Sequence, residues 1–369
     1  MIEDLFRFAD ELGPVKILHI SLRGPELKAV VVVDNTACGP AIGGVRMAPD
    51  VSAEEAFRLA RAMTLKNAAA DLPHGGGKSV IFADPKMPPR DKEELIRAFA
   101  CAIAGLSDYI PGPDMGTDEL AMGWVKDEIG RAAGLPRELG GIPLDELGAT
   151  GYGLAAAIDV ASKAIKLELK GARVAIQGFG AVGKHTARFL AQKGCELVAC
   201  SDSRGTLISA DGLDVSALIT LKDSGKSVID FPRGEKSDPD AIIDVPCDIW
   251  VPAARPDVLT RENAGRLKAR IVAQGANIPC TTEAEAMLEA RGVLVLPDFV
   301  VNAGGVICAA VEYHGGTEST AFATIEEKLR RNTALVIEQS RRSNTSMRQA
   351  AMVLAIGRIR NAQRARRWR

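Results

Sequence analysis

The chain has 369 residues, of which 47% are hydrophobic and 25% are charged, a composition typical of a globular protein with room for two domains. Its 46 Lys and Arg residues balance 47 Asp and Glu residues, which argues against general nucleic-acid binding through excess positive charge. The seven cysteines include no Cys-x-x-Cys pair, so we expect reduced thiols and no metal site. No segment resembles a signal peptide or a membrane span, and we therefore expect a cytoplasmic protein without a membrane partner.

The first part of the chain, up to about residue 135, alternates strand and helix signals. It is predicted to begin with a helix, and strands are expected over 16–20 and 28–33. An amphipathic pattern predicts a helix over 54–70, and a further helix is expected near 91–105. Such alternation is typical of an α/β domain.

Two lysines twelve positions apart are the strongest candidates for chemistry in this part. Lys66 falls in the predicted helix, and Lys78 follows Pro73-His-Gly-Gly-Gly, which we expect to form a rigid turn. Consecutive glycines cost backbone entropy, so they are expected where the backbone approaches a ligand closely. A lysine held there is partly desolvated, which lowers its pKa towards neutrality and suits it to proton transfer. A solvated lysine on a loop is the alternative.

A nucleotide-binding pattern begins at residue 174. A short apolar run leads into Gly178-Phe-Gly180-Ala181-Val182-Gly183, then into a helical pattern and a strand that ends at Asp202. The glycines allow a tight turn and let a pyrophosphate lie at the helix N-terminus, while the acid can bind ribose hydroxyls. A packing motif without a ligand is the alternative.

The choice between NAD and NADP depends on the end of the second strand. Asp202 would repel a 2′-phosphate and therefore favours NAD, whereas Arg204, which follows Ser203, could receive that phosphate. We expect NAD, with NADP or dual use as the alternative.

The remaining segments complete the organisation. Residues 136–150 are rich in Gly and Pro and are predicted to form a linker, and later strands are expected at 248–251, 270–273 and 293–296. From Lys328 onward there are twelve Lys and Arg residues and one acid, in a pattern with apolar residues at helical spacing. These features predict closing helices with arginines outside or at a subunit contact; a tail that binds nucleic acid is the alternative.

Several separated motifs together resemble those of the glutamate/leucine/phenylalanine/valine dehydrogenase superfamily. They are Gly39–Arg46, the segment with Lys66 and Lys78, Pro113–Thr117, Ala149–Gly153, Gly178–Gly183, Gln274–Asn277 and Asn302–Ile307. This family oxidises an L-amino acid to a 2-oxo acid and ammonia, with NAD or NADP accepting the hydride. The resemblance covers almost the whole chain and implies the same reaction here.

The resemblance also implies roles for matching positions. Lys66 resembles the lysine that binds the substrate carboxylate, with Gly43 and Gly44 allowing close approach. Lys78 resembles the catalytic lysine that polarises a water for attack on the iminium carbon. Asp114 resembles the carboxylate that shuttles protons to and from the amine, although a helix cap is its alternative role. A zwitterionic substrate needs one cation, one anion and a base, so the set is chemically consistent.

Other positions are implied to contact the cofactor. Thr150 and Asn277 resemble the groups that position the nicotinamide. Ala254 and Asn302 complete the expected cofactor contacts.

The expected substrate pocket departs from the pattern of glutamate-specific relatives. Those relatives carry a lysine before the Gly-Gly of the first motif and a serine seven positions after Asn302, whereas this chain has Ile42 and Ala309. A buried glutamate carboxylate would find no partner there. Gly112 and Val306 lie beside these positions in the implied pocket. We therefore expect a leucine-dehydrogenase-like pocket and an apolar L-amino acid of the Leu, Val, Ile, Met or Phe type.

Two alternatives to this substrate remain. Segments 114–124 and 141–148 look more like the glutamate branch, so glutamate dehydrogenase is the first. A catalytically silent nucleotide-binding sensor is the second, and the retained Lys66, Lys78 and Asp114 argue against it.

The sequence thus predicts an α/β fold of two domains with a cleft between them. Residues 1–135, joined by C-terminal helices over about 335–369, are expected to bind the substrate and form a homo-oligomer. Residues 150–334 are expected to form a Rossmann-type doubly wound sheet that binds the dinucleotide.

Overall fold

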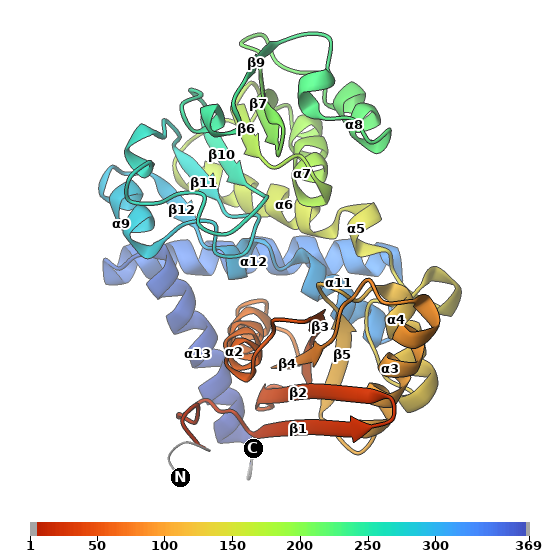
Figure 1. The fold of residues 1–369 in the computed structure, drawn as a ribbon. Helices are drawn as coiled ribbons and strands as arrows, with labels where there is room; N and C mark the ends of the chain where they lie inside the picture. Colours follow the sequence, from red (N-terminus) through yellow and green to blue (C-terminus); the bar gives the residue numbers. More distant parts are fainter. Residues whose placement is uncertain (1–5, 367–369) are drawn as a thin grey trace. The chain divides into compact units, whose positions relative to one another are not determined.

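The computed structural model describes residues 6–366 and divides into two compact units (Figure 1). Unit 1 comprises the chain up to Pro143, Val306–Ala321 and the chain from Ala355. Unit 2 comprises Leu144–Gly305 and Phe322–Leu354. The helix predicted at the N-terminus falls largely on residues 1–5, outside the described part.

The C-terminal helices divide differently from the expected assignment of about 335–369 to the first domain. Helices α12 (Glu318–Ser343) and α13 (Met347–Ala365) each contribute residues to both units. The middle of this region belongs to unit 2 because α12 packs on α6 (Ala149–Ala164) there. A Cβ placed on Gly153 of α6 would lie 3.3 Å from Leu329 of α12.

Unit 1 is built on a five-stranded sheet in the order β1-β2-β4-β3-β5. The strands are β1 (Lys16–Arg23), β2 (Glu26–Asn35), β3 (Ala41–Ala48), β4 (Gly75–Phe82) and β5 (Tyr109–Pro113). β2 runs antiparallel to β1 and β4, whereas β3 runs parallel to β4 and β5. β3 and β4 end side by side, at Ala48 and Phe82, whereas the shorter β5 ends beside Val45 of β3.

Helices cover both faces of this sheet (Figure 1). Its helices are α2 (Ala53–Ala69), α3 (Pro89–Ala102), α4 (Glu119–Ile129), the 3-10 helix η1 (Arg137–Leu139) and part of α11 (Gly304–Tyr313). α2 packs on Val30, Val32 and Val80, while α3 and α4 pack on the opposite face. Side chains alternate between the two faces along each strand, so both faces of β2 are apolar.

The glycine run 75–77 lies in β4 and does not form the rigid turn predicted from the sequence. A Cβ on Gly76 would lie 2.0 Å from the backbone nitrogen of Thr64 in α2. A Cβ on Gly75 would lie 1.7 Å from the carbonyl oxygen of Asn35 in β2. The glycines are therefore required because the helix and the neighbouring strand approach β4 closely, and not because a ligand does.

Unit 2 contains a seven-stranded sheet in the order β12-β11-β10-β6-β7-β8-β9. The strands are β6 (Arg173–Gln177), β7 (Glu196–Asp202), β8 (Gly205–Ile208), β9 (Glu235–Ser237), β10 (Ile249–Pro252), β11 (Ile271–Ala273) and β12 (Leu294–Leu296). The run from β12 to β7 is parallel, and β8 and β9 add antiparallel strands at one edge. The predicted α/β fold with a Rossmann-type sheet is confirmed.

The helices of unit 2 connect these strands. They are α5 (Leu144–Leu147), α6, α7 (Ala181–Gln192), α8 (Val215–Asp223), η2 (Val228–Asp230), η3 (Pro239–Ile243), η4 (Ala264–Arg266), α9 (Thr282–Ala290) and α10 (Asp298–Val301), together with parts of α11, α12 and α13. The predicted linker over 136–150 contains η1 and α5. Across residues 6–366, no helix combines the length and the apolar character needed to cross a membrane.

Candidate catalytic and dinucleotide-binding sites

One face of the unit 1 sheet carries the candidate catalytic residues. Gly44 and Arg46 of β3 alternate with residues that face α3 and α4, so they face α2. Lys78 of β4 faces the same side, since Val80 two residues later packs on α2. Asp114 directly follows β5. The parallel register of β4, β3 and β5 thus brings these side chains together in the middle of β3 and β4, where the shorter β5 ends.

Lys78 and Asp114 form a direct ion pair through Nζ and Oδ2. The Lys78 side chain is 6% exposed and that of Asp114 is 17% exposed, so the pair is shielded but open at the carboxylate. Gly44 lies directly below: a Cβ there would be 2.8 Å from Asp114 Cβ and 3.0 Å from Lys78 Nζ. Any side chain at position 44 would displace the pair.

Arg46 is a second cation beside Asp114 and was not among the site residues predicted from the sequence. Its Nη2 lies 3.3 Å from Asp114 Oδ1, and its Nη1 lies 2.6 Å from Glu55 Oε1 of α2. Asp114 is therefore held between two cations. The signal was present, because Arg46 stands two positions after Gly44 and shares its face once the segment is recognised as a strand.

Burial lowers the pKa of Lys78 to about 7. Repulsion from Arg46 and Lys66 acts in the same direction, while the Glu55 carboxylate opposes it. This agrees with the lowered pKa expected from the sequence. An amine with a pKa near neutrality exchanges protons readily at physiological pH. Lys66 lies in the last turn of α2, on the side of the sheet that carries Lys78.

An apolar cluster lies next to this charged group. Ile42, Ile110 and Ala133 are buried together, and Ala309 and Tyr313 of α11 pack against them. Ile42 and Ile110 are register partners in β3 and β5. The structure therefore brings together Ile42 and Ala309, the two positions from which the apolar pocket was predicted.

The other expected substrate positions lie around this cluster. Gly112 of β5 pairs with Gly44, and the space above it is limited mainly by the Ala133 carbonyl oxygen, 3.7 Å from a Cβ placed there. Gly43 lies in β3, between the neighbouring strands β4 and β5, and pairs with Pro111 of β5. Val306 lies on α11, three residues before Ala309.

In unit 2, a cavity of about 860 Å³ opens at the turn between β6 and α7. Five expected cofactor residues line it: Gly178, Gly180, Asp202, Ser203 and Ala254. Gly178 has a φ of +90° and a Cβ there would lie 2.5 Å from that of Ala254, so glycine is required. Ala181, Val182 and Gly183 form the first turn of α7, whose N-terminus has no side-chain cap. Free N–H groups beside an open cavity fit a dinucleotide pyrophosphate.

Asp202 already has four protein donors. Its oxygens accept hydrogen bonds from Lys222 Nζ at 2.8 Å, Ser227 Oγ at 2.8 Å, and the N–H groups of Val228 at 2.9 Å and Arg204 at 3.0 Å. Burial alone would raise the pKa of Asp202, but these bonds lower it to about 2. Lys222, which comes from α8, was not among the residues predicted from the sequence.

The remaining cofactor residues also lie in unit 2. Asn302 Nδ2 donates to Asn277 Oδ1 at 3.0 Å, so these two residues are joined. Thr150 Oγ1 lies 3.2 Å from a Cβ placed on Gly305. Arg204 is exposed and pairs with Asp230 at 3.0 Å. Among the described residues, no group of three or more His, Cys, Asp or Glu side chains is arranged to hold a metal ion.

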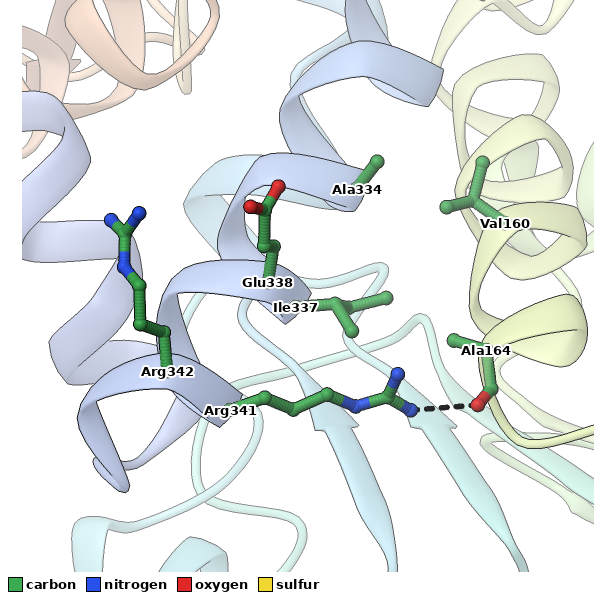
Figure 2. A pocket seen from close by; sticks show the side chains of 7 residues that line it. All are labelled: Val160, Ala164, Ala334, Ile337, Glu338, Arg341 and Arg342. Carbon is green, nitrogen blue, oxygen red and sulfur yellow. Dashed lines mark hydrogen bonds between the residues drawn. The ribbon is translucent and has the colours of Figure 1, made fainter.

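A second cavity of about 480 Å³ lies between α6 and α12 (Figure 2). Val160, Ala164, Ala334 and Ile337 supply apolar surface, and Glu338, Arg341 and Arg342 supply charges. Arg341 donates to the carbonyl oxygen of Ala164 at 2.6 Å, as Figure 2 shows. None of the expected catalytic or cofactor residues lines this cavity.

Two family models match this chain. Residues 140–367 match the model described as glutamate/leucine/phenylalanine/valine dehydrogenase. Residues 21–131 match the model described as the Glu/Leu/Phe/Val dehydrogenase dimerisation domain.

Curated relatives are similar over most of their length. The chain is 40% identical to a glutamate dehydrogenase of Aeropyrum pernix, across 90% of this chain and 85% of the relative. It is 36% identical to an NADP-specific glutamate dehydrogenase of Saccharolobus shibatae, across 90% and 83%. It is also 36% identical to an NAD-specific glutamate dehydrogenase of Staphylococcus aureus, across 90% and 85%.

Solved structures share the fold. The hetero-hexameric glutamate dehydrogenase from Thermus thermophilus, in a Leu-bound form, superposes with a TM-score of 0.84 at 31% identity, covering 96% of this chain and 91% of that chain. The L-tryptophan dehydrogenase from Nostoc punctiforme gives 0.78 at 27% identity, covering 98% and 100%.

The apolar substrate predicted from Ile42 and Ala309 is wrong, because relatives at 36–40% identity over about 90% of the chain are named glutamate dehydrogenases. The prediction failed for a physical reason: a glutamate side chain also contains two methylene groups, which pack on apolar walls as an aliphatic side chain does. The apolar residues Ile42 and Ala309 therefore indicate the character of one part of the pocket only. They do not indicate which charged groups line the rest of it.

Proposed function

This chain belongs to the glutamate/leucine/phenylalanine/valine dehydrogenase family and is an NAD(P)-dependent amino acid dehydrogenase acting on the CH–NH2 group; from this premise, we propose that its substrate is L-glutamate. The products are 2-oxoglutarate and ammonia. The observation that carries the proposal is the similarity to glutamate dehydrogenases over about nine-tenths of the chain.

We propose that unit 1 supplies the acid–base groups. Lys66 binds the α-carboxylate of the substrate, and Asp114 accepts a proton from its ammonium group. A dinucleotide held by unit 2 would supply the hydride acceptor that converts the amine into an iminium ion. Lys78, as a neutral amine, removes a proton from the water that adds to the iminium carbon. Asp114 returns its proton to the nitrogen of the resulting carbinolamine, the C–N bond breaks to release ammonia, and Asp114 takes the hydroxyl proton as the 2-oxo acid forms.

The electrostatics of the site support these assignments. Lys78 has a pKa of about 7 because of its burial, so a large fraction is neutral at neutral pH. Arg46 Nη2 lies 3.3 Å from Asp114 Oδ1, so a guanidinium faces this carboxylate in addition to Lys78.

The apolar cluster gives the substrate side chain its place. We propose that the methylene groups of glutamate pack on Ile42, Ile110 and Ala133. The γ-carboxylate of glutamate then forms an ion pair with a positively charged group outside this cluster, since neither Ile42 nor Ala309 can pair with it.

Unit 2 is proposed to hold the cofactor. Gly178, Gly180 and the start of α7 bind the pyrophosphate, and Asp202 lies at the adenosine ribose. Thr150, Asn277 and Asn302 position the nicotinamide. The match to a dimerisation domain supports our inference that the protein forms a homo-oligomer.

The test of the substrate is a panel of the standard L-amino acids with NAD and with NADP, followed by reduced-nicotinamide absorbance. Glutamate should give the highest kcat/KM. A higher kcat/KM for leucine, valine or another apolar amino acid would overturn the proposal.

The same assay tests the catalytic assignments. Lys78→Ala and Asp114→Asn should each lower kcat by about 10²–10⁴-fold, the usual contribution of a positioned acid or base. Dinucleotide affinity, measured by calorimetry, should stay unchanged because both residues lie in unit 1. Near-normal turnover in either variant would remove that residue from its role.

A further inference from the structure

Glu312 of α11 is a buried carboxylate that the reaction above does not use. The residue is 6% exposed. Its Oε1 accepts the N–H groups of Gly134 at 2.8 Å and Leu135 at 3.0 Å, and its Oε2 accepts the N–H of Ile142 at 2.8 Å. One carboxylate thus fixes three points of the segment 134–142. All of these residues belong to unit 1.

The beginning of this segment is also fixed to β5. Ala133 donates its N–H to the Pro111 carbonyl at 2.8 Å, and Arg131 Nε donates to the Tyr109 carbonyl at 3.0 Å. Ala133 is a member of the apolar cluster with Ile42 and Ile110. The backbone around residue 133 therefore forms one wall of the proposed side-chain pocket.

Gly134 connects this wall to the catalytic carboxylate. It has a φ of +72°, and a Cβ there would lie 2.5 Å from Cδ of Pro113. Pro113 is the residue before Asp114. A shift of Gly134 would therefore move the end of β5, and with it Asp114, which directly follows β5.

We propose that Glu312 is a positioning residue that sets the width of the amino-acid side-chain pocket and supports the position of Asp114. α11 carries Ala309 one turn before Glu312, and Ala309 packs on the same cluster as Ala133. The carboxylate therefore fixes the separation of two opposing walls, Ala309 on the helix and Ala133 on the segment. This inference deepens the proposed function and relies on it for the location of the pocket.

A carboxylate suits this task better than an amide. Hydrogen bonds to an ionised acceptor are stronger than neutral ones, and both carboxylate oxygens accept. In Glu312→Gln the volume is preserved, but one oxygen becomes an NH2 group that faces a backbone N–H. At least one of the three contacts is then lost without leaving a cavity.

The test measures substrate discrimination in Glu312→Gln and Glu312→Ala. The readout is the ratio of kcat/KM for the best amino acid to kcat/KM for amino acids with shorter or differently shaped side chains. We expect this ratio to fall about tenfold in Glu312→Gln, as for the loss of a hydrogen bond to a charged group, and further in Glu312→Ala. The KM for the amino acid should rise, and the KM for the dinucleotide should stay constant.

This ratio separates positioning from a purely structural role, since partial unfolding lowers all activities by the same factor. Gly134→Ala strains the same segment from the other side and should lower the ratio as well. Glu93→Gln is the matched control: Glu93 of α3 pairs with Arg97 at 2.9 Å, and the ratio should stay unchanged.

An unchanged ratio in both Glu312 variants, with only a lower melting temperature, would overturn the inference. Because the ratio takes the best substrate as its reference, it is measurable whichever amino acid that is. A wild type that prefers an apolar amino acid would therefore overturn the glutamate proposal while still testing Glu312.

Discussion

At the residue scale, the proposed proton transfers depend on the two cations beside Asp114. These are Lys78 and Arg46, and they are buried to different extents. The Lys78 side chain is 6% exposed, whereas the Arg46 side chain is 21% exposed and also pairs with Glu55. A guanidinium keeps its proton in proteins, but a buried ammonium loses it readily. Arg46 therefore remains a permanent cation beside Asp114, while Lys78 changes its charge in the proposed reaction.

The pH dependence of kcat for oxidative deamination follows from the pKa of Lys78, which burial lowers from 10.5 to about 7. The proposed reaction needs the neutral amine, so kcat should rise with pH through a midpoint at about 7 and level off above it. Arg46→Gln removes a positive charge that repels the Lys78 ammonium, so the pKa of Lys78 rises and the acid limb moves to higher pH. A pH profile of kcat checks both statements.

Arg97→Gln is a suitable control for this experiment. Arg97 pairs with Glu93 and Asp127 on the opposite face of the sheet, so its loss should leave the acid limb in place. An acid limb that does not move in Arg46→Gln would show that Arg46 does not act on Lys78.

The preference between NAD and NADP depends on Asp202 and Lys222. Asp202→Ala removes a negative charge at the proposed ribose site and frees Lys222, so NADP use should improve and any NAD preference should narrow or reverse. Lys222→Ala should lower kcat/KM for NADP by about tenfold and affect NAD less, as expected for a lost charge-assisted contact.

Arg204→Ala tests the alternative partner of a 2′-phosphate. Arg204 is exposed and engaged with Asp230, so its loss should matter less than that of Lys222. The measurement is the ratio of kcat/KM for the two dinucleotides. An unchanged ratio in Asp202→Ala would show that this carboxylate does not face the ribose.

At the scale of elements, helix α2 is held at both of its ends. Ser52 caps the N-terminus by accepting the Glu55 N–H. At the C-terminus, Arg358 of α13 donates to the carbonyl oxygens of Ala68 at 3.0 Å and Ala69 at 2.7 Å. Lys66 lies in this last turn, so the C-terminal helix supports the lysine proposed to bind the substrate carboxylate.

Removal of the Arg358 guanidinium should therefore weaken substrate binding. We expect Arg358→Ala to raise the KM for the amino acid about tenfold with a smaller change in kcat, because it removes charge-assisted hydrogen bonds to the helix C-terminus. Steady-state kinetics with varied amino acid checks this. Arg360→Ala is the control, since Arg360 pairs with Glu11 at 2.7 Å and is half exposed. An equal rise in the KM for the amino acid in both variants would indicate a general effect of lost positive charge, and not a specific role of Arg358.

Elements with a strong periodic pattern could be predicted from the sequence, and glycine-rich ones could not. β6, α7 and β7 follow the order expected from their apolar spacing, and α2 lies within one residue of its predicted range. The glycine run of β4 has no side-chain period and was mistaken for a turn. β8 and β9 are short edge strands with weak patterns.

The candidate site was partly predictable for a related reason. Lys78 and Asp114 were identified by their motifs, and the structure places them in contact. Arg46 was missed because its position on the face of Gly44 follows only once 41–48 is recognised as a strand. Lys222 and Glu312 were missed because their roles depend on contacts between distant segments, which no local pattern in the sequence reports.

At the scale of the whole molecule, each unit has its own sheet and its own apolar core. The candidate dinucleotide residues belong to unit 2, and the Lys78–Asp114 pair belongs to unit 1. Stabilisation by a ligand should therefore appear first in the unit that binds it. At about 100 times its Kd, a ligand stabilises the state that binds it by about 2.7 kcal/mol, which hydrogen exchange detects locally.

We expect NAD alone to slow amide exchange at residues 177–184, in the turn from β6 into α7, and at 222–230, which hold Asp202. The physical reason is that the dinucleotide takes up the free N–H groups of α7 and restrains the segment that caps the Asp202 carboxylate. Lys78→Ala should show the same protection, because its substitution leaves unit 2 intact. Asp202→Ala should lose protection at 222–230 while keeping it at 177–184. Protection that requires the amino acid as well, or that is absent from 177–184, would contradict the placement of the pyrophosphate at this turn.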